Sequence, residues 1–147
     1  MPVESLIKKK VRMENVVTNL KLEYPDSKCS LRYESSFQLL TATILSAQCT
    51  DERVNKVTKG LFANYPTPQD FVMLPIETIK KEIYSTGFYN NKAKSIKAMA
   101  ESVVNEYDGS LPNTLDEMVK LPGVGRKTAN VVLGNIQGIP SIAVDTH

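Results

Sequence analysis

Apolar residues recur at helical spacing along most of the chain. The first such run consists of Ile7, Val11, Val17, Leu20 and Tyr24, and Pro25 ends it. Further helices are predicted from Phe37 to Gln48, from Asp51 to Tyr65, from Pro68 onward, from Ile76 to near Gly87, from Ile96 to Tyr107, from Thr114 to Lys120, and over 126–136. No segment shows the sustained two-residue alternation of a β-strand. The pattern predicts an all-α protein built as a compact array of short helices.

Polar residues mark where some of these helices begin. Thr67 can cap a helix whose first residue is Pro68. Ser35 or Ser36 can cap the segment 37–48, which is mostly apolar and carries no charged residue. A helix that is apolar on most of its surface is expected in a protein interior. We therefore predict that the segment 37–48 is a buried central helix.

Composition narrows the class of protein. The 147 residues are 41% hydrophobic and 23% charged, which is typical of an ordinary globular domain. The net charge of +2 is too small to predict a polyanionic partner by itself. No apolar run could span a bilayer, and the N-terminus lacks the apolar core of a signal peptide. We expect a cytoplasmic protein with no membrane partner, whose two cysteines, Cys29 and Cys49, are free thiols.

A turn of proline and glycines joins the last two predicted helices. Residues 121–125 read Leu-Pro-Gly-Val-Gly. Gly123 and Gly125 allow a close approach to the backbone, and the first amides of the following helix have no acceptor within that helix. These amides lie at the positive end of the helix dipole and form an anion site. Arg126 and Lys127 add positive charge there.

The turn also fits a purely structural role, as the sharp corner of an αα-hairpin. A lone Gly-x-Gly turn would favour that role. Here the proline, both glycines, the basic pair and two apolar helices coincide, and Thr114 and Glu117 give the first helix the spacing of a capping box. We therefore interpret residues 114–136 as a two-helix unit that contacts DNA phosphate without reading base sequence.

Four segments of the chain resemble the endonuclease III family of base-excision DNA glycosylases. "LPGVGRKTANVVL" resembles the helix-hairpin-helix of that family, and "LLTATILSAQCTDERVNK" and "TGFYNNKAKSI" resemble two further family segments. "AVDTH" resembles the motif that holds the catalytic aspartate. The resemblance implies the helix-hairpin-helix DNA glycosylase fold, a six-helix barrel with a second helical domain.

The resemblance assigns the chemistry to Lys127 and Asp145. By composition alone Lys127 fits a solvated phosphate contact, but family members with lyase activity have their nucleophilic lysine at this position of the motif. The amine must be neutral to attack the sugar. Asp145 fits a helix N-cap, and in the family the matching aspartate assists the attack and stabilises positive charge on the sugar. Both roles of Asp145 can hold together.

Two further residues gain a DNA-binding role from the resemblance. Gln48 fits a polar residue on a surface turn, and Phe88 lies in the glycine turn "GFYNN", where its ring could pack back on the core. In the family, the matching glutamine fills the gap left by an extruded base, and the position of Phe88 supplies an apolar wedge, commonly leucine. A phenylalanine can also insert between bases, and such wedges offset the few kcal/mol needed to flip a nucleotide. The predicted DNA-binding residues are therefore Gln48, Phe88, Gly123, Gly125 and Arg126.

The resemblance also divides the chain. Residues 1–28 correspond to the N-terminal helix of the split second domain, residues 29–139 to the six-helix barrel with the helix-hairpin-helix at 114–136, and residues 140–147 to the start of the second domain. Complete family members end with four closely spaced cysteines that bind a [4Fe–4S] cluster, whereas this chain has two cysteines at other spacings. We expect a C-terminally truncated family member that binds no cluster and no other metal, and that has little or no activity by itself.

The predicted function is base-excision repair of oxidised pyrimidines in damaged double-stranded DNA. A monomeric, nucleoid-associated DNA N-glycosylase with AP lyase activity would form a Schiff base through its lysine. Two alternatives differ from this function: a non-catalytic helix-hairpin-helix module or inactive fragment, and a monofunctional glycosylase. A binding module needs neither Lys127 nor Asp145. Adenine-removing relatives lack the lysine, so Lys127 disfavours a monofunctional enzyme.

Overall fold

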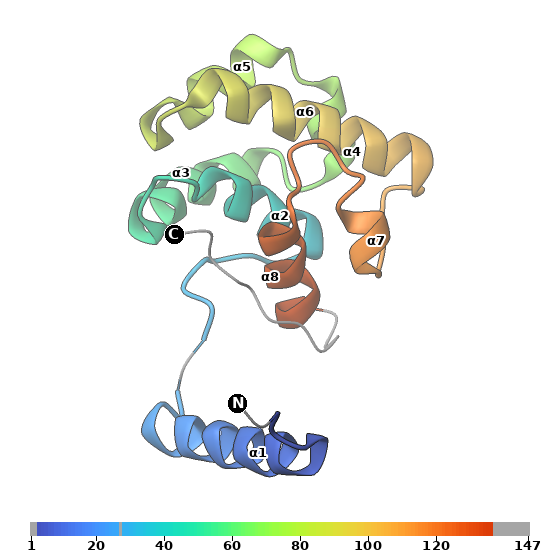
Figure 1. Ribbon diagram of the computed structural model, residues 1–147. Helices are drawn as coiled ribbons and strands as arrows, with labels where there is room; N and C mark the ends of the chain where they lie inside the picture. Colours follow the sequence, from blue (N-terminus) through green and yellow to red (C-terminus); the bar gives the residue numbers. More distant parts are fainter. Residues whose placement is uncertain (1–2, 27, 137–147) are drawn as a thin grey trace.

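A computed structural model describes residues 3–26 and 28–136, and in these ranges every regular element is a helix (Figure 1). The elements are α1 (Leu6–Glu23), α2 (Ser36–Leu45), α3 (Asp51–Asn64), α4 (Pro68–Met73), α5 (Ile76–Ile83), the 3-10 helix η1 (Tyr84–Thr86), α6 (Tyr89–Glu106), α7 (Leu115–Met118) and α8 (Arg126–Ile136). The prediction of an all-α fold is confirmed.

The core lies among the helices from α2 to α8. Nearly every residue of α2 is buried, and α2 packs against α3, α6 and α8 (Figure 1). α6 in turn packs against α4 and α5. The prediction of a buried central helix is therefore confirmed, but α2 ends at Leu45 and does not reach Gln48. It ends where the Ser46 hydroxyl donates to the carbonyl of Thr43 at 2.7 Å, a local bond that competes with a further helical turn.

Side-chain caps fix the start of four core helices. The residues whose hydroxyls accept a backbone amide are Ser35 for α2, Thr50 for α3, Thr67 for α4 and Thr114 for α7. At α4 the cap is reciprocal, because Asp70 Oδ2 also accepts the amide of Thr67 at 3.0 Å. Each cap satisfies an amide that has no acceptor within its helix, and such a cap is worth about 1 kcal/mol.

The capping box predicted at Thr114 is only half present. The Thr114 hydroxyl accepts the amide of Glu117 at 3.3 Å. The Glu117 carboxylate accepts from Lys120 Nζ at 2.9 Å and from the Tyr107 hydroxyl at 2.7 Å. These partners take the carboxylate that a full capping box would turn back to the Thr114 amide. The prediction was wrong in this half, because Lys120 and Tyr107, the residue that follows α6, compete for Glu117.

α1 contributes no residue to the core. None of its residues is buried, and Figure 1 shows it joined to the other helices by an extended segment. Its large apolar side chains, Leu6, Ile7, Val11 and Leu20 among them, are exposed. Neither α1 nor any other helix in the described ranges is long and apolar enough to cross a membrane. The division of the chain into domains stays a prediction.

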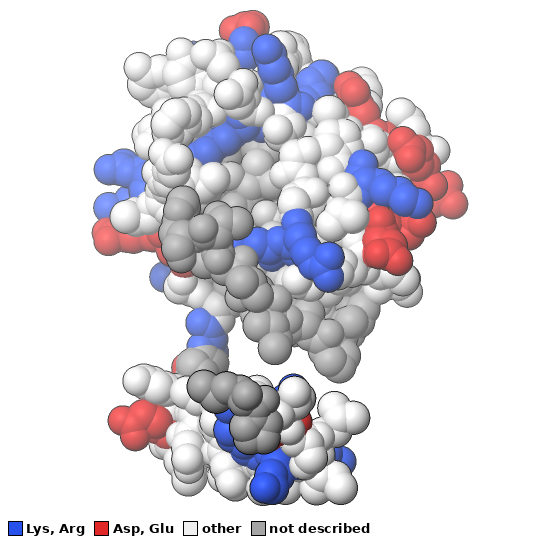
Figure 2. All heavy atoms as spheres, viewed as in Figure 1, with Lys and Arg blue, Asp and Glu red and all other residues white. Residues whose placement is uncertain are grey.

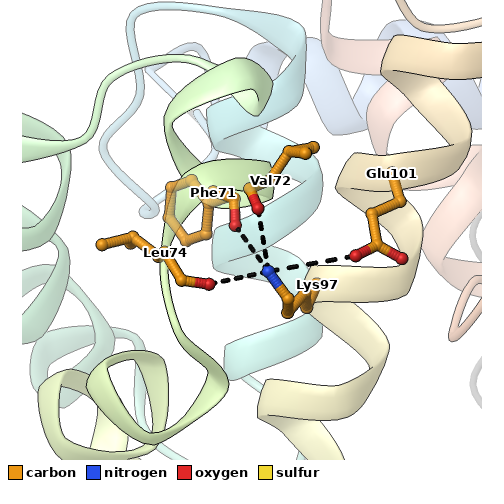
Figure 3. Close-up of polar contacts among 5 residues, drawn as sticks. All are labelled: Phe71, Val72, Leu74, Lys97 and Glu101. Carbon is orange, nitrogen blue, oxygen red and sulfur yellow. Dashed lines mark hydrogen bonds and ion pairs between the residues drawn. The ribbon is translucent and has the colours of Figure 1, made fainter.

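A lysine joins α6 to the end of α4 (Figure 3). Lys97 Nζ donates to the carbonyls of Leu74 at 2.7 Å, Val72 at 2.9 Å and Phe71 at 3.4 Å. Glu101 Oε1 lies 3.9 Å from the same nitrogen. The last carbonyls of a helix have no donor within that helix, and a positive charge is favourable there. Lys97 therefore satisfies the carbonyls at the C-terminal end of α4 and connects this end to α6.

Candidate functional site

An open cleft of about 310 Å³ lies where the end of α2, the start of α6 and the turn before α8 meet. The lining residues are Thr43, Ile44, Ala47, Gln48, Phe88, Asn91, Lys92, Ser95, Gly123 and Thr128. Three of the predicted site residues, Gln48, Phe88 and Gly123, thus share one cleft. A larger pocket of about 390 Å³ between residues 32–34 and α3 includes none of the predicted residues.

Gln48 and Phe88 both adopt a backbone conformation that their residue types disfavour. In the described ranges, the non-glycine residues with positive φ are Gln48 (52°), Phe88 (47°) and Asp108 (54°). Aspartate tolerates this conformation because its side chain can bond locally, but a bulky residue there is unusual. Such a residue costs about 1–3 kcal/mol and is found mostly at functional sites. Two of the three residues with this strain line the cleft.

The exposure of Phe88 excludes one interpretation of the sequence. The residue is 64% exposed, so its ring does not pack back on the core. Gln48 is exposed as well. Tyr84 and Tyr89 flank the turn in the sequence, and their ring centroids lie 4.8 Å apart, so a contact between the two rings braces the turn that contains Phe88. An exposed aromatic ring in a braced turn is suited to contact a partner.

The two glycines of the turn before α8 have different roles. Gly123 has φ of 75°, and a Cβ added there would lie 2.5 Å from the Cβ of Ser95. The fold therefore requires glycine at position 123. Gly125 does not have a positive φ, and a Cβ there would meet nothing within 4 Å. Packing within the fold therefore does not require glycine at position 125. Glycine there fits a site at which a ligand approaches the backbone closely.

Arg126 and Lys127 begin α8 and are exposed. The first helical hydrogen bond of α8 runs from the amide of Ala129 to the carbonyl of Gly125 at 3.0 Å. The amides before Ala129 lie at the positive end of the helix dipole, where anions are stabilised. Thr128 lines the cleft, whereas Lys127, the preceding residue of α8, is exposed and is not among the lining residues.

Charge is unevenly distributed over the face of the molecule in Figure 2. Lys and Arg side chains lie in separate groups, and several Asp and Glu side chains lie together beside α7 and the end of α6, with others elsewhere on this face. In α7, hydrogen bonds from Lys120 and from the Tyr107 hydroxyl hold the pKa of Glu117 below its usual value. This acidic side would repel DNA, so an anion at the hairpin is expected on the side of Arg126 and Lys127.

The sequence analysis missed Lys92, which lies in the same cleft. The residue is 6% exposed, and its Nζ donates to the carbonyls of Leu45 at 2.8 Å and Thr86 at 2.9 Å. Burial lowers its pKa, and the neighbouring Cys49 acts in the opposite direction. One signal was present in the sequence: a lysine in the first turn of a helix is disfavoured by the helix dipole, so its position needs another reason.

Asp145 and the segment 140–147 lie outside the described residues, so the prediction for Asp145 stays open. Within the described part of the chain, no group of three or more His, Cys, Asp or Glu side chains could hold a metal ion. Cys29 and Cys49 are both half-buried free thiols. The roles predicted for Lys127, Gln48, Phe88, Gly123, Gly125 and Arg126 also stay predictions.

Comparison with known proteins gives a family. Residues 41–147 match the family model of the HhH-GPD superfamily base excision DNA repair proteins. Endonuclease III of Bacillus subtilis is 49% identical over 124 residues, which are 84% of this chain and 57% of that protein. Endonuclease III of Synechocystis is 48% identical over 146 residues, which are 99% of this chain and 67% of that protein. The chain thus spans 57% to 67% of the length of these two relatives.

Solved structures agree with these relatives. A trapped covalent intermediate of endonuclease III with DNA, an estranged-adenine complex, matches with a TM-score of 0.86 and 46% identity over 94% of this chain and 65% of that chain. A thermostable thymine-DNA glycosylase matches with a TM-score of 0.82 and 28% identity over 93% of this chain and 64% of that chain. The helix-hairpin-helix DNA glycosylase fold is thereby confirmed. The chain belongs to the HhH-GPD superfamily of base excision DNA repair proteins.

Proposed function

We propose that this chain provides the DNA-binding and catalytic part of a DNA N-glycosylase with AP lyase activity in base-excision repair. One observation carries the proposal. Gln48 and Phe88 are exposed and strained, and they line one cleft with the glycine turn of the hairpin. That arrangement suits a protein that holds a DNA backbone at the hairpin and fills the space of an extruded base with two side chains.

In the proposed reaction Lys127 is the nucleophile. Its neutral Nζ attacks C1′ of the damaged nucleotide, the bond from C1′ to the base breaks, and the base leaves with the electron pair and accepts a proton. Opening of the sugar ring gives a Schiff base between Nζ and C1′. Removal of a proton from C2′ then expels the 3′ phosphate and nicks the strand. Lys127 is exposed, so a sugar could reach it.

The remaining predicted residues position the DNA. The amides at Gly123 and Gly125, together with Arg126, hold a phosphate without reading sequence. Gln48 and Phe88 occupy the gap left by the extruded nucleotide. Asp145 stabilises positive charge that develops on the sugar. The proposed partner is damaged double-stranded DNA, bound by a monomer in the compartment that contains the chromosome.

The base specificity is proposed from the nearer relatives. The matched structures include a thymine-DNA glycosylase as well as endonuclease III, so the fold by itself does not fix the damaged base. Endonuclease III shares more identity with this chain, 46% against 28%. On that ground we propose oxidised pyrimidines as the substrate class. A non-catalytic DNA-binding module is disfavoured, because it would not need Lys127.

The residues of this chain do not fit an iron–sulfur cluster. Complete members of the endonuclease III family are expected to hold a [4Fe–4S] cluster, which needs about four thiolates. The whole sequence contains two cysteines, and no metal-binding group occurs among the residues that the structure describes. No step of the proposed reaction uses a cluster.

The proposal is tested by covalent trapping. Residues 1–147 are compared with an extended chain, in which residues 1–147 are followed by the remaining part of the Bacillus subtilis relative. Each protein is incubated with abasic-site duplex and sodium borohydride. We expect a covalent adduct from the extended chain and little or none from residues 1–147. If the extended chain bound DNA without forming an adduct, the binding-module alternative would replace the proposed function.

A further inference from the structure

Lys92 joins the two turns that present Gln48 and Phe88 to the cleft. Its Nζ donates to the carbonyl of Leu45, the last residue of α2, and to that of Thr86, the last residue of η1. Gln48 comes shortly after Leu45 in the chain, and Phe88 comes after Thr86 with one glycine between them. A single ammonium group therefore fixes the spacing of the two segments that lead to these side chains.

The two carbonyls need this donor. The last carbonyls of a helix have no donor within the helix, and the end of the dipole there favours a positive charge. Lys92 is 6% exposed, so water has little access to replace it. A buried carbonyl left without a partner costs about 1–3 kcal/mol. The lysine itself gains nothing from its own helix, because it lies in the first turn of α6, at the positive end of that dipole.

The strain in both turns gives these hydrogen bonds a second role. A left-handed conformation at Gln48 or Phe88 persists only where the surrounding structure holds it. The ring pair of Tyr84 and Tyr89 braces the turn at Phe88 alone. Lys92 contacts the segments before both turns. It is therefore a contact through which a change at one turn can reach the other.

We propose that Lys92 is a positioning residue for DNA recognition. It holds Gln48 and Phe88 at the separation at which both can enter damaged DNA, and it acts through the two protein carbonyls that its buried Nζ binds and not through a contact with the DNA. The inference rests on the proposed function, since it takes these two side chains as the pair that fills the space of an extruded base.

Lys97 provides a matched control on the same helix (Figure 3). Its Nζ also donates to carbonyls at a helix end, those of Phe71, Val72 and Leu74. None of these residues lines the cleft, and Lys97 does not line it either. Lys92→Met and Lys97→Met each remove an ammonium group of α6 from carbonyl acceptors in other elements. A general loss of stability should therefore follow from both, and a loss of DNA discrimination from Lys92→Met alone.

The experiment measures binding of the extended chain to two duplexes. One duplex contains a tetrahydrofuran abasic analogue and the other is undamaged. The discrimination is the dissociation constant for undamaged duplex divided by that for the abasic analogue. We expect Lys92→Met to lower this ratio about tenfold, because Gln48 and Phe88 would lose part of their contacts with the DNA, and one stacking contact contributes about 1–3 kcal/mol. Lys97→Met should leave the ratio unchanged. Lys92→Arg, which can donate to both carbonyls, should restore most of the ratio.

The possible results separate the inference from the proposed function. A wild-type chain without discrimination would contradict the proposed function. A wild-type chain with discrimination that Lys92→Met retains, or that Lys97→Met loses equally, would overturn the role of Lys92. If Lys92→Met does not melt cooperatively, Lys92→Gln is measured in its place, because the shorter amide cannot span both carbonyls. Wild-type discrimination in that variant would overturn the inference as well.

Discussion

The two walls of the cleft are built in different ways. The hairpin wall, residues 121–128, has in sequence order the proline, glycines and cations that a phosphate site needs. In the turn wall, residues 46–49 and 86–92, Gln48 and Phe88 have a positive φ, a backbone conformation that neither residue type favours. The geometry of this wall depends on Lys92, which bonds to segments of α2 and η1. Local sequence thus specifies the first wall, and contacts between distant segments specify the second.

This difference predicts separate effects of substitutions. A change in the hairpin wall should affect the chemistry or the binding of any DNA, because phosphate contacts carry no sequence information. A change in the turn wall should affect damaged DNA more than undamaged DNA, because only damaged DNA offers an extruded nucleotide. The following substitutions test this division, from the largest expected effect to the smallest.

The largest effect is expected for Lys127. Lys127→Ala and Lys127→Gln in the extended chain should abolish borohydride trapping on abasic DNA, because they remove the amine that forms the Schiff base. Binding to undamaged duplex should fall by much less. Trapping is measured by gel shift of the labelled duplex after denaturation. Undiminished trapping in either variant would assign the nucleophile to another residue.

Substitutions in the turn wall should follow. Gln48→Ala and Phe88→Ala should each weaken binding to the abasic analogue about tenfold or more, since the loss of a base–side-chain stacking contact costs about 1–3 kcal/mol. Binding to undamaged duplex should change little. Fluorescence anisotropy of both duplexes measures the two constants. Equal losses on both DNAs would make these residues ordinary backbone contacts and would remove the distinction between the walls.

The two glycines should separate binding from stability. Gly125→Val should lower the free energy of unfolding by only about 1 kcal/mol, because the site is open and the cost is that of a poor N-cap of α8, and it should weaken binding to both duplexes by a similar factor of about ten. Gly123→Val should destabilise the fold by about 2–4 kcal/mol, because it combines a positive φ with a clash against Ser95. Thermal melting and anisotropy measure the two effects. A Gly125→Val variant that lost only damage recognition would place this turn in the base pocket.

The smallest effect is expected for Glu117, which stands outside both walls. Lys120 and the Tyr107 hydroxyl lower its pKa in the folded protein. Glu117 therefore binds a proton more readily in the unfolded state than in the folded state. Its carboxylate stabilises the fold above the usual carboxyl pKa, and this stabilisation is lost as the pH falls through the lowered pKa. Glu117→Gln should reduce the melting temperature slightly at pH 7 and not at all near pH 2. A difference that persisted at low pH would mean that charge is not the cause.

Much of the fold could be predicted from the sequence, because its signals are local. Pro25, Thr67 with Pro68, and the glycine turn at 121–125 each determine a boundary within a few residues of their own position. The buried α2 followed from the absence of charge over ten residues. The end of that helix was predicted too far along, because a single hydroxyl bond from Ser46 decides it.

The candidate site was predictable only in part. Gly123 was found from the chemistry of its turn, and Gln48 and Phe88 through the resemblance to a family, and the structure brings all three to one cleft. Lys92 could not be found in this way, because its role depends on two carbonyls that come close only after folding. The side-chain partner of Glu117 could not be predicted either, because its carboxylate accepts a hydrogen bond from Tyr107 and does not cap the Thr114 amide.

The position of Lys92 also bears on how the protein folds. Its bond to Leu45 spans 47 positions of the chain, and one turn further along α6 Ser95 supports the hairpin that precedes α8. Contacts of such long sequence separation form late and slow the folding rate. The cleft cannot then exist in a chain in which only some helices have formed. Hydrogen exchange of amides near residues 88–95 should follow global unfolding and not local fraying. A growing chain would acquire its DNA-binding surface in a single late step, once α8 has been synthesised.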